Sequence, residues 1–124
     1  MTEVLLATLI FYLFQLMLPH IIAVARDEIT AISLLGVRDR KVDKSILVQR
    51  ASRAAVNMQE SMIVFLPLAC LAIASATPVY ETAAIWLGLR VSHLLTYLIG
   101  IPYVRTLIWY GTLYCLASMA IALF

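Results

Sequence analysis

The sequence predicts an all-α integral membrane protein that folds as a four-helix bundle. Its 124 residues are 64% hydrophobic, whereas soluble domains are close to half apolar. The apolar residues are grouped in four blocks, each long enough to cross a bilayer. Backbone groups in lipid must be hydrogen-bonded within the chain, so these blocks are helices rather than strands. No repeat, low-complexity tract or linker separates a second domain, so residues 1–124 are expected to form a single transmembrane domain.

The four spans differ in what surrounds them. Val4–Ala25 has no basic segment before it and no small-residue cleavage site after it, so we expect a retained span rather than a signal peptide. Ile46–Ala76 is too long for a simple span and is expected to begin in water before it enters the membrane. The third and fourth spans are Thr82–Ile99 and Thr106–Phe124, and a glycine and a proline between them mark a short turn.

Basic residues give the expected orientation. Seven of the nine Lys and Arg residues lie between positions 26 and 53, around the first connection. They are Arg26, Arg38, Arg40, Lys41, Lys44, Arg50 and Arg53. Arg105 lies in the third connection, whereas the second connection, TPVYE, has no basic residue. The first and third connections are therefore expected to face the cytoplasm, with both termini on the outer side. Very short termini without eukaryotic retention signals favour a bacterial inner membrane with periplasmic termini. The basic run at 38–44 either sets topology alone or also contacts anionic lipid.

Two sets of polar side chains interrupt the apolar blocks. In the second block the set is Arg50, Arg53, Asn57 and Glu60. In the third block it is Arg90, His93 and Tyr97. Steps of three and four residues separate the members, so each set shares one face of its helix. Ionisable groups in a membrane helix cost about 3 kcal/mol each on insertion scales, and they usually mark a pathway, a ligand site or an internal pair.

The two polar faces can be combined into one site. The third helix runs opposite to the second, and counting residues places Arg90 at the depth of Glu60, so we predict a Glu60–Arg90 ion pair inside the bundle. Arg105 lies at the cytoplasmic mouth. Arginine forks suit carboxylates, so a small anion with several carboxylates fits, and a phosphate-bearing lipid headgroup fits the same chemistry. The alternative is purely structural, with an internal pair and arginines that reach to lipid phosphates.

The other polar and thiol residues indicate no second site. Cys70 and Cys115 lie in spans without CxxC or metal-ligand spacing. We expect both cysteines to be inert packing residues. For the protein as a whole we expect no bound metal and no nucleic-acid partner. Gln15 and His20 lie in the first span, where Pro19 is a candidate bend. Hydrogen bonding of His20 within the bundle is favoured over a place at the site, and Gln15 is left unassigned.

Two stretches resemble the family of membrane-associated proteins in eicosanoid and glutathione metabolism, abbreviated MAPEG. "RASRAAVNMQES", residues 50–61, resembles a second-helix pattern of Arg, three residues, Asn, two residues and Glu. "RVSHLLTYLIGIPYVRTL", residues 90–107, resembles a third-helix pattern of Arg, two residues, His, three residues, Tyr and a downstream Arg. The tail "CLASMAIALF" is also similar to the fourth helix of the family, so the resemblance covers most of residues 50–124.

The resemblance implies a four-helix protomer that assembles as a homotrimer, with glutathione between neighbouring protomers near the cytoplasmic face. It implies that Arg105 is catalytic and stabilises the glutathione thiolate, in keeping with the effect of an adjacent cation on the pKa of a thiol. With Arg50 added from the same helix face, the residues implied to contact or support glutathione are Arg50, Arg53, Asn57, Glu60, Arg90, His93 and Tyr97.

The sequence departs from the family members that make prostaglandins or leukotrienes. Thr106 replaces a serine, Trp109 replaces a tyrosine and Ser61 replaces a tyrosine, and the turn before the fourth helix is one residue shorter. These differences argue against prostaglandin or leukotriene chemistry in particular and leave glutathione binding in place.

Three functions follow as hypotheses. The first is a membrane glutathione-dependent transferase or peroxidase, whose lipophilic substrate arrives from the bilayer. The second is a non-catalytic lipid-binding protein of the same fold, since fold does not imply activity. The third is a small transporter subunit, which is disfavoured because the spans lack the broken helices typical of transporters, although Pro67 is a candidate kink.

Overall fold

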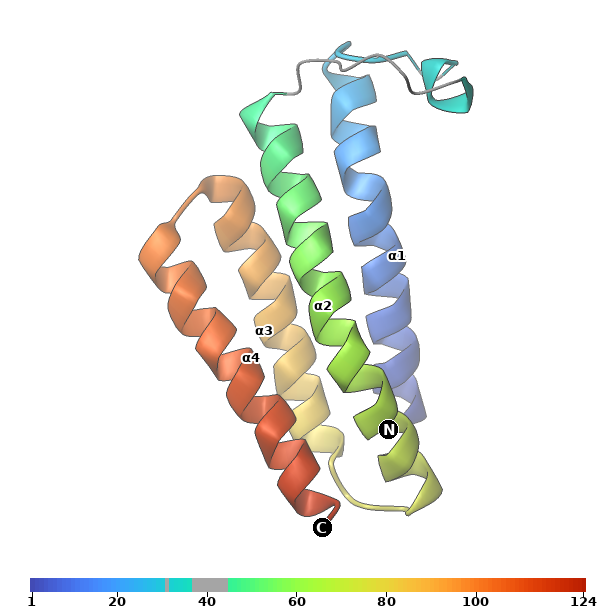
Figure 1. Cartoon of the computed structure of the whole chain (residues 1–124), viewed down its shortest axis with the longest axis vertical. Coiled ribbons are helices and arrows are strands. Elements are labelled where there is room, and N and C mark those ends of the chain that lie inside the picture. The colour runs from blue at the N-terminus through green and yellow to red at the C-terminus, as the bar shows by residue number, and fades with distance from the viewer. Residues whose placement is uncertain (31, 37–44) are drawn as a thin grey trace.

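The computed structural model confirms the all-α four-helix architecture (Figure 1). It describes residues 1–30, 32–36 and 45–124, so the basic run at 38–44 lies outside the described residues. The elements are α1 (Thr2–Ala25), the short 3₁₀ helix η1 (Ser33–Leu35), α2 (Ile46–Ala74), α3 (Tyr80–Ile99) and α4 (Pro102–Ala122). In the described part of the chain, four α-helices are long and apolar enough to cross a membrane. The chain is an integral membrane protein.

Five helix ends differ from the sequence-based bounds by two to four residues, and two of these differences have clear backbone reasons. α2 ends at Ala74 rather than Ala76, because Ala76 has a left-handed φ of 52° that no right-handed helix accommodates. α4 begins at Pro102 rather than Thr106. Proline suits the first turn of a helix, since its fixed φ matches the helix and the N–H that it lacks has no partner there. The turn between α3 and α4 is therefore very short.

The helices form two antiparallel hairpins that pack side by side (Figure 1). α1 packs along α2, α3 packs along α4, and the hairpins meet mainly through α2 and α3. Both termini lie at one end of the bundle, which we call the terminal end. The α1–α2 connection and the α3–α4 turn lie at the opposite end, which we call the turn end.

Local hydrogen bonds hold the turn end together. The hydroxyl of Ser45 caps α2 by accepting from the backbone N–H of Val48 at 3.4 Å. The backbone N–H of Ser45 in turn donates to the Glu28 carboxylate at 3.3 Å. Because Glu28 lies three residues beyond the end of α1, this bond ties the chain after α1 to the start of α2.

The hydrophobic core fills the terminal half of the bundle. Phe65 of α2 and Trp86 of α3 are fully buried and stacked, with ring centroids 4.1 Å apart and planes 3° from parallel. Met58, Met62 and Met119 pack in the same cluster. Many large apolar side chains are exposed on the outside of the bundle, which is the arrangement expected of helices that face lipid. Toward the turn end the core gives way to a polar layer.

Candidate functional site

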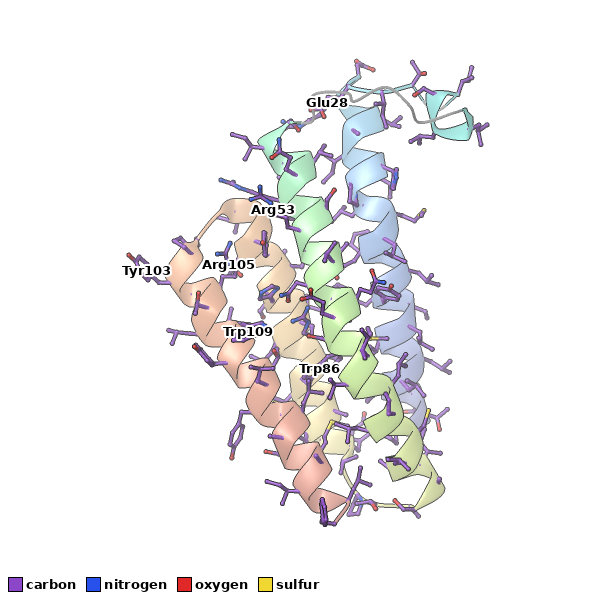
Figure 2. The ribbon with its side chains drawn as sticks, in the orientation of Figure 1. Glu28, Arg53, Trp86, Tyr103, Arg105 and Trp109 are labelled. Atoms are coloured by element: carbon purple, nitrogen blue, oxygen red, sulfur yellow. The ribbon has the colours of Figure 1, made fainter. Side chains whose placement is uncertain are left out.

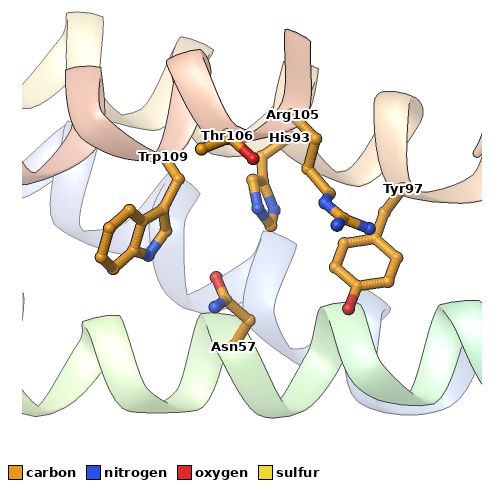
Figure 3. Close-up of a pocket in the computed structure, with 6 residues that line it drawn as sticks. All are labelled: Asn57, His93, Tyr97, Arg105, Thr106 and Trp109. Carbon is orange, nitrogen blue, oxygen red and sulfur yellow. The ribbon is translucent and has the colours of Figure 1, made fainter. Parts of the chain in front are cut away.

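A pocket of about 200 Å³ opens in the polar layer between α2, α3 and α4 (Figure 3). Its lining residues are Asn57, His93, Tyr97, Arg105, Thr106 and Trp109. Figure 3 shows the Trp109 indole at one end of the pocket and the Tyr97 ring with the Arg105 guanidinium at the other. Asn57 rises from α2 on the opposite wall. The structure therefore brings together four residues predicted from sequence, with Asn57 on one helix, His93 and Tyr97 on the next and Arg105 on the last.

The tight α3–α4 turn places Arg105 beside Tyr97. Gly100 ends α3 with a left-handed φ of 86°, and Pro102 starts α4 immediately afterwards. The chain reverses within one turn, so the Arg105 guanidinium carbon lies 4.6 Å from the centroid of the Tyr97 ring. A cation over an aromatic face at this distance is attracted by the ring quadrupole. His93 also makes an edge contact with the Tyr97 ring, at 5.6 Å between ring centroids.

Arg90 lies behind the pocket wall and orients Asn57. Its side chain is 1% exposed. Nη2 donates to Asn57 Oδ1 at 3.0 Å, and Nε donates to the sulfur of Met58 at 3.3 Å. Since the amide oxygen of Asn57 already accepts this bond, its NH₂ group is the part left to face a ligand as a donor. Arg90 therefore acts on the pocket through Asn57.

The predicted Glu60–Arg90 ion pair is wrong within this chain. Glu60 is exposed on α2, and Arg90 bonds Asn57 and Met58 instead. The physical reason is the pitch of α2: Glu60 is rotated by about 60° from Asn57 and about 160° from Met58, so it lies beyond Asn57 on the side away from Met58. Equal depth along two helices did not mean that the two side chains face each other.

The two remaining arginines of α2 also lie outside the pocket lining. Arg50 is partly buried, and its Nη1 donates to the backbone carbonyl of Leu98 at 3.3 Å, near the end of α3. An added Cβ on Gly100 would lie 2.8 Å from the Arg50 guanidinium, so this group packs directly on the turn. In this chain Arg50 therefore holds the α3–α4 turn. Arg53 is exposed on α2, toward the turn end of the bundle (Figure 2).

Thr106 and Trp109 line the pocket but were not predicted as site residues. They follow Arg105 by one and four residues. The step of four puts Trp109 on the same face of α4 as Arg105, and this spacing was the signal that could have found it. The Thr106 hydroxyl donates to the backbone carbonyl of Pro102 at 3.0 Å, so its proton is already committed and its oxygen remains to accept.

The residues outside the site behave as follows. His20 Nδ1 lies 3.3 Å from the carbonyl oxygen of Leu16, which agrees with hydrogen bonding inside the first helix. Cys70 is exposed and Cys115 is buried, and neither lines the pocket. α1 and α2 both continue as helices through their prolines, Pro19 and Pro67.

The chemistry of the pocket favours an anion. Of the described residues that line it, Arg105 alone carries a permanent positive charge, and none is a carboxylate. Asn57 contributes amide donors and the aromatic rings supply low-polarity walls. Arg105 and Thr106 also lie in the first turns of α4, where the helix dipole favours negative charge. Such a pocket can hold an anionic group or lower the cost of forming one.

Comparison of the sequence with known protein families identifies the family of this chain. Residues 4–124 match the model of the MAPEG family, which covers all four helices and every residue of the pocket. No match was found among curated proteins or among solved structures. Since the match spans nearly the whole chain, the chain belongs to the MAPEG family.

Proposed function

We propose that the protein is a membrane glutathione-dependent transferase or peroxidase. The observation that carries this proposal is the placement of Arg105, the one permanent cation among the described residues that line the pocket, none of which is a carboxylate. Glutathione brings two carboxylates and a thiol, and a thiol next to a cation ionises more readily. Family membership supports the same ligand, because MAPEG proteins are mostly glutathione-dependent enzymes.

In this proposal some pocket residues bind glutathione and Arg105 activates its thiol. The thiol proton of glutathione passes to solvent, and the Arg105 guanidinium stabilises the sulfur anion that remains. Asn57 donates its amide hydrogens to the tripeptide, while Tyr97 and His93 hold the arginine side of the pocket. The sulfur then attacks an electrophilic carbon and displaces its leaving group. With a hydroperoxide it instead attacks an oxygen atom, which releases an alcohol and a sulfenic acid that a second glutathione converts to disulfide and water.

A neighbouring copy is expected to complete this site, and the homotrimer implied by the family resemblance would provide one. Two observations support a shared site. The pocket, at about 200 Å³, is smaller than the roughly 300–1,000 Å³ of sites for drug-sized ligands, so it encloses part of a tripeptide. Arg53 and Glu60 are both exposed on α2, and charged groups at bilayer depth normally face a protein interior or a water-filled cavity. The cytoplasmic face of a bacterial inner membrane remains the proposed location of the turn end.

A non-catalytic lipid-binding protein is the second candidate, and one observation favours it. The Thr106 proton is bonded to Pro102, and the Arg105 guanidinium lies over the Tyr97 ring. Arg105 and Thr106 are thus both engaged within the chain. In this second function the same cavity would take a lipid headgroup without activating a thiol.

The ultraviolet thiolate absorbance of bound glutathione separates the two functions. We expect the wild-type protein in detergent to generate the thiolate band at neutral pH when glutathione is added, because Arg105 favours the ionised sulfur. Arg105→Gln keeps side-chain hydrogen bonding without the charge and should abolish the band. A wild-type protein that binds glutathione with its thiol still protonated would contradict the enzyme function and favour the lipid-binding alternative.

A further inference from the structure

Arg90 is a buried cation with one hydrogen-bonding group unused. Its Nη2 and Nε donate to Asn57 and Met58, but Nη1 is buried without a hydrogen-bond partner among the described residues. A buried donor left without a partner costs roughly 1–3 kcal/mol, and more when the group is charged. The neighbourhood of Nη1 is therefore where a further acceptor is expected.

Gln15 of α1 has the matching deficiency. Its side chain is 2% exposed, and its amide oxygen, Oε1, is buried without a partner among the described residues. Gln15 lies on the buried stripe of α1 together with Val4, Thr8, Pro19 and Ala23. This stripe faces α2 and α3, which are the helices that α1 contacts. The bundle interior thus holds one unused acceptor on α1 and one unused charged donor on α3.

The register of the helices places Gln15 and Arg90 at one depth. α1 and α3 both begin at the terminal end (Figure 1), where Val4 of α1 and Val79, which precedes α3, belong to one buried cluster. Gln15 and Arg90 each lie eleven residues further along parallel helices, a rise of about 16 Å in both cases. Counting along the two helices therefore predicts that the two side chains lie at a similar depth inside the bundle.

The turn end gives the same register independently. The Glu28–Ser45 bond joins the chain after α1 to the start of α2. Counting from there, Gln15 lies about 15 Å down α1 from Ala25, and Met58 lies about 18 Å down α2 from Ile46. Met58 is the residue whose sulfur accepts from Arg90, so α1, α2 and α3 meet at one level.

We propose that Gln15 and Arg90 form a buried binding site for one water molecule, which accepts from Arg90 Nη1 and donates to Gln15 Oε1. The two groups make no direct hydrogen bond, and a buried water typically makes about three bonds to otherwise unsatisfied polar groups. Trp86, one helical turn from Arg90, supplies a third unused buried atom, its indole N–H. The water links α1 through Arg90 to Asn57 and hence to the pocket wall.

A carboxylate placed at residue 15 tests the arrangement without any ligand. In Gln15→Glu the new charge faces Arg90, directly or through the water, so the thermal midpoint should equal or exceed that of the wild type. Thr8→Asp is the matched control, since Thr8 is fully buried on the same stripe two turns away. Its unpaired carboxylate should lower the midpoint by roughly 5 °C or more. A fall in Gln15→Glu as large as in Thr8→Asp would overturn the placement of Gln15 beside Arg90.

A crystal structure of the wild-type protein tests the water itself. We expect density for one water within hydrogen-bond distance of both Gln15 Oε1 and Arg90 Nη1. A direct bond between the two side chains in that map would overturn the water site. Neither experiment depends on glutathione, so the proposed function and this inference can fail separately.

Discussion

Replacing Arg105 by alanine is expected to lower the rate of glutathione conjugation to chlorodinitrobenzene by about 100-fold or more. Arg105 is the one permanent cation among the described residues that line the pocket. Without it the thiol returns toward its ordinary pKa, and little thiolate forms at neutral pH. The protein itself should remain folded, because Arg105 is only partly buried and its contact with Tyr97 is a cation–π contact near the surface.

The matched control for this substitution is Arg26→Ala. Arg26 is exposed at the end of α1, at the turn end of the bundle but outside the pocket. The Arg26→Ala substitution therefore removes one positive charge from the same end of the molecule and leaves the site unchanged. Initial rates of the two variants, measured in the same detergent, should differ by most of the expected factor. Equal rates for Arg105→Ala and the wild type would remove Arg105 from the reaction.

Substitution of Gly100 by alanine is expected to destabilise the fold by at least about 2 kcal/mol. Gly100 has a φ of 86°, which disfavours any residue with a Cβ. The new Cβ would also approach the Arg50 guanidinium to 2.8 Å, so that group must move. Displacing it breaks its bond to the Leu98 carbonyl and frees the turn that places Arg105. Thermal unfolding in detergent measures the loss.

Gly88→Ala provides the comparison for the glycine effect. Gly88 lies inside α3, and a Cβ there meets no atom within 4 Å. Alanine favours a helix over glycine by up to about 1 kcal/mol, so this variant should be unchanged or more stable. Similar midpoints for Gly100→Ala and Gly88→Ala would show that neither the backbone conformation nor the Arg50 contact constrains the turn.

The helical architecture and one wall of the pocket were predictable from sequence because each rests on periodicity within one helix. Four apolar blocks gave the four helices. His93 and Tyr97 share a face of α3 by their spacing, and they lie together in the pocket. Spacing inside a helix fixes which side chains share a face, and this needs no knowledge of the neighbouring helices.

The α2 face was harder to predict, because periodicity does not say which neighbour a face meets. The residues of α2 that point into the bundle form a stripe that contains Ala54, Met58 and Ser61. Asn57 lies at the edge of this stripe and reaches the pocket, whereas Arg53 and Glu60, one turn before and after it, lie beyond that edge and are exposed. The relative rotation of two packed helices decides this outcome, and the sequence of one helix does not contain it.

The α4 wall depended on backbone geometry at a single turn. The left-handed conformation at Gly100 and the start of α4 at Pro102 bring Thr106 and Trp109 onto the pocket. Spacing could have grouped Trp109 with Arg105, but it could not show that this face closes over His93. Gln15 was visible as a polar residue in an apolar span, and its level beside Arg90 required the register of three helices.

Thermal stability of the purified protein in detergent against increasing glutathione tests the central claim most directly. A ligand that binds the folded state alone raises the unfolding midpoint in proportion to the logarithm of its concentration once the site is saturated. We predict a dose-dependent rise for the wild type and a much smaller rise for Arg105→Ala. A wild-type midpoint that does not move up to millimolar glutathione would contradict glutathione binding and direct attention to lipid ligands.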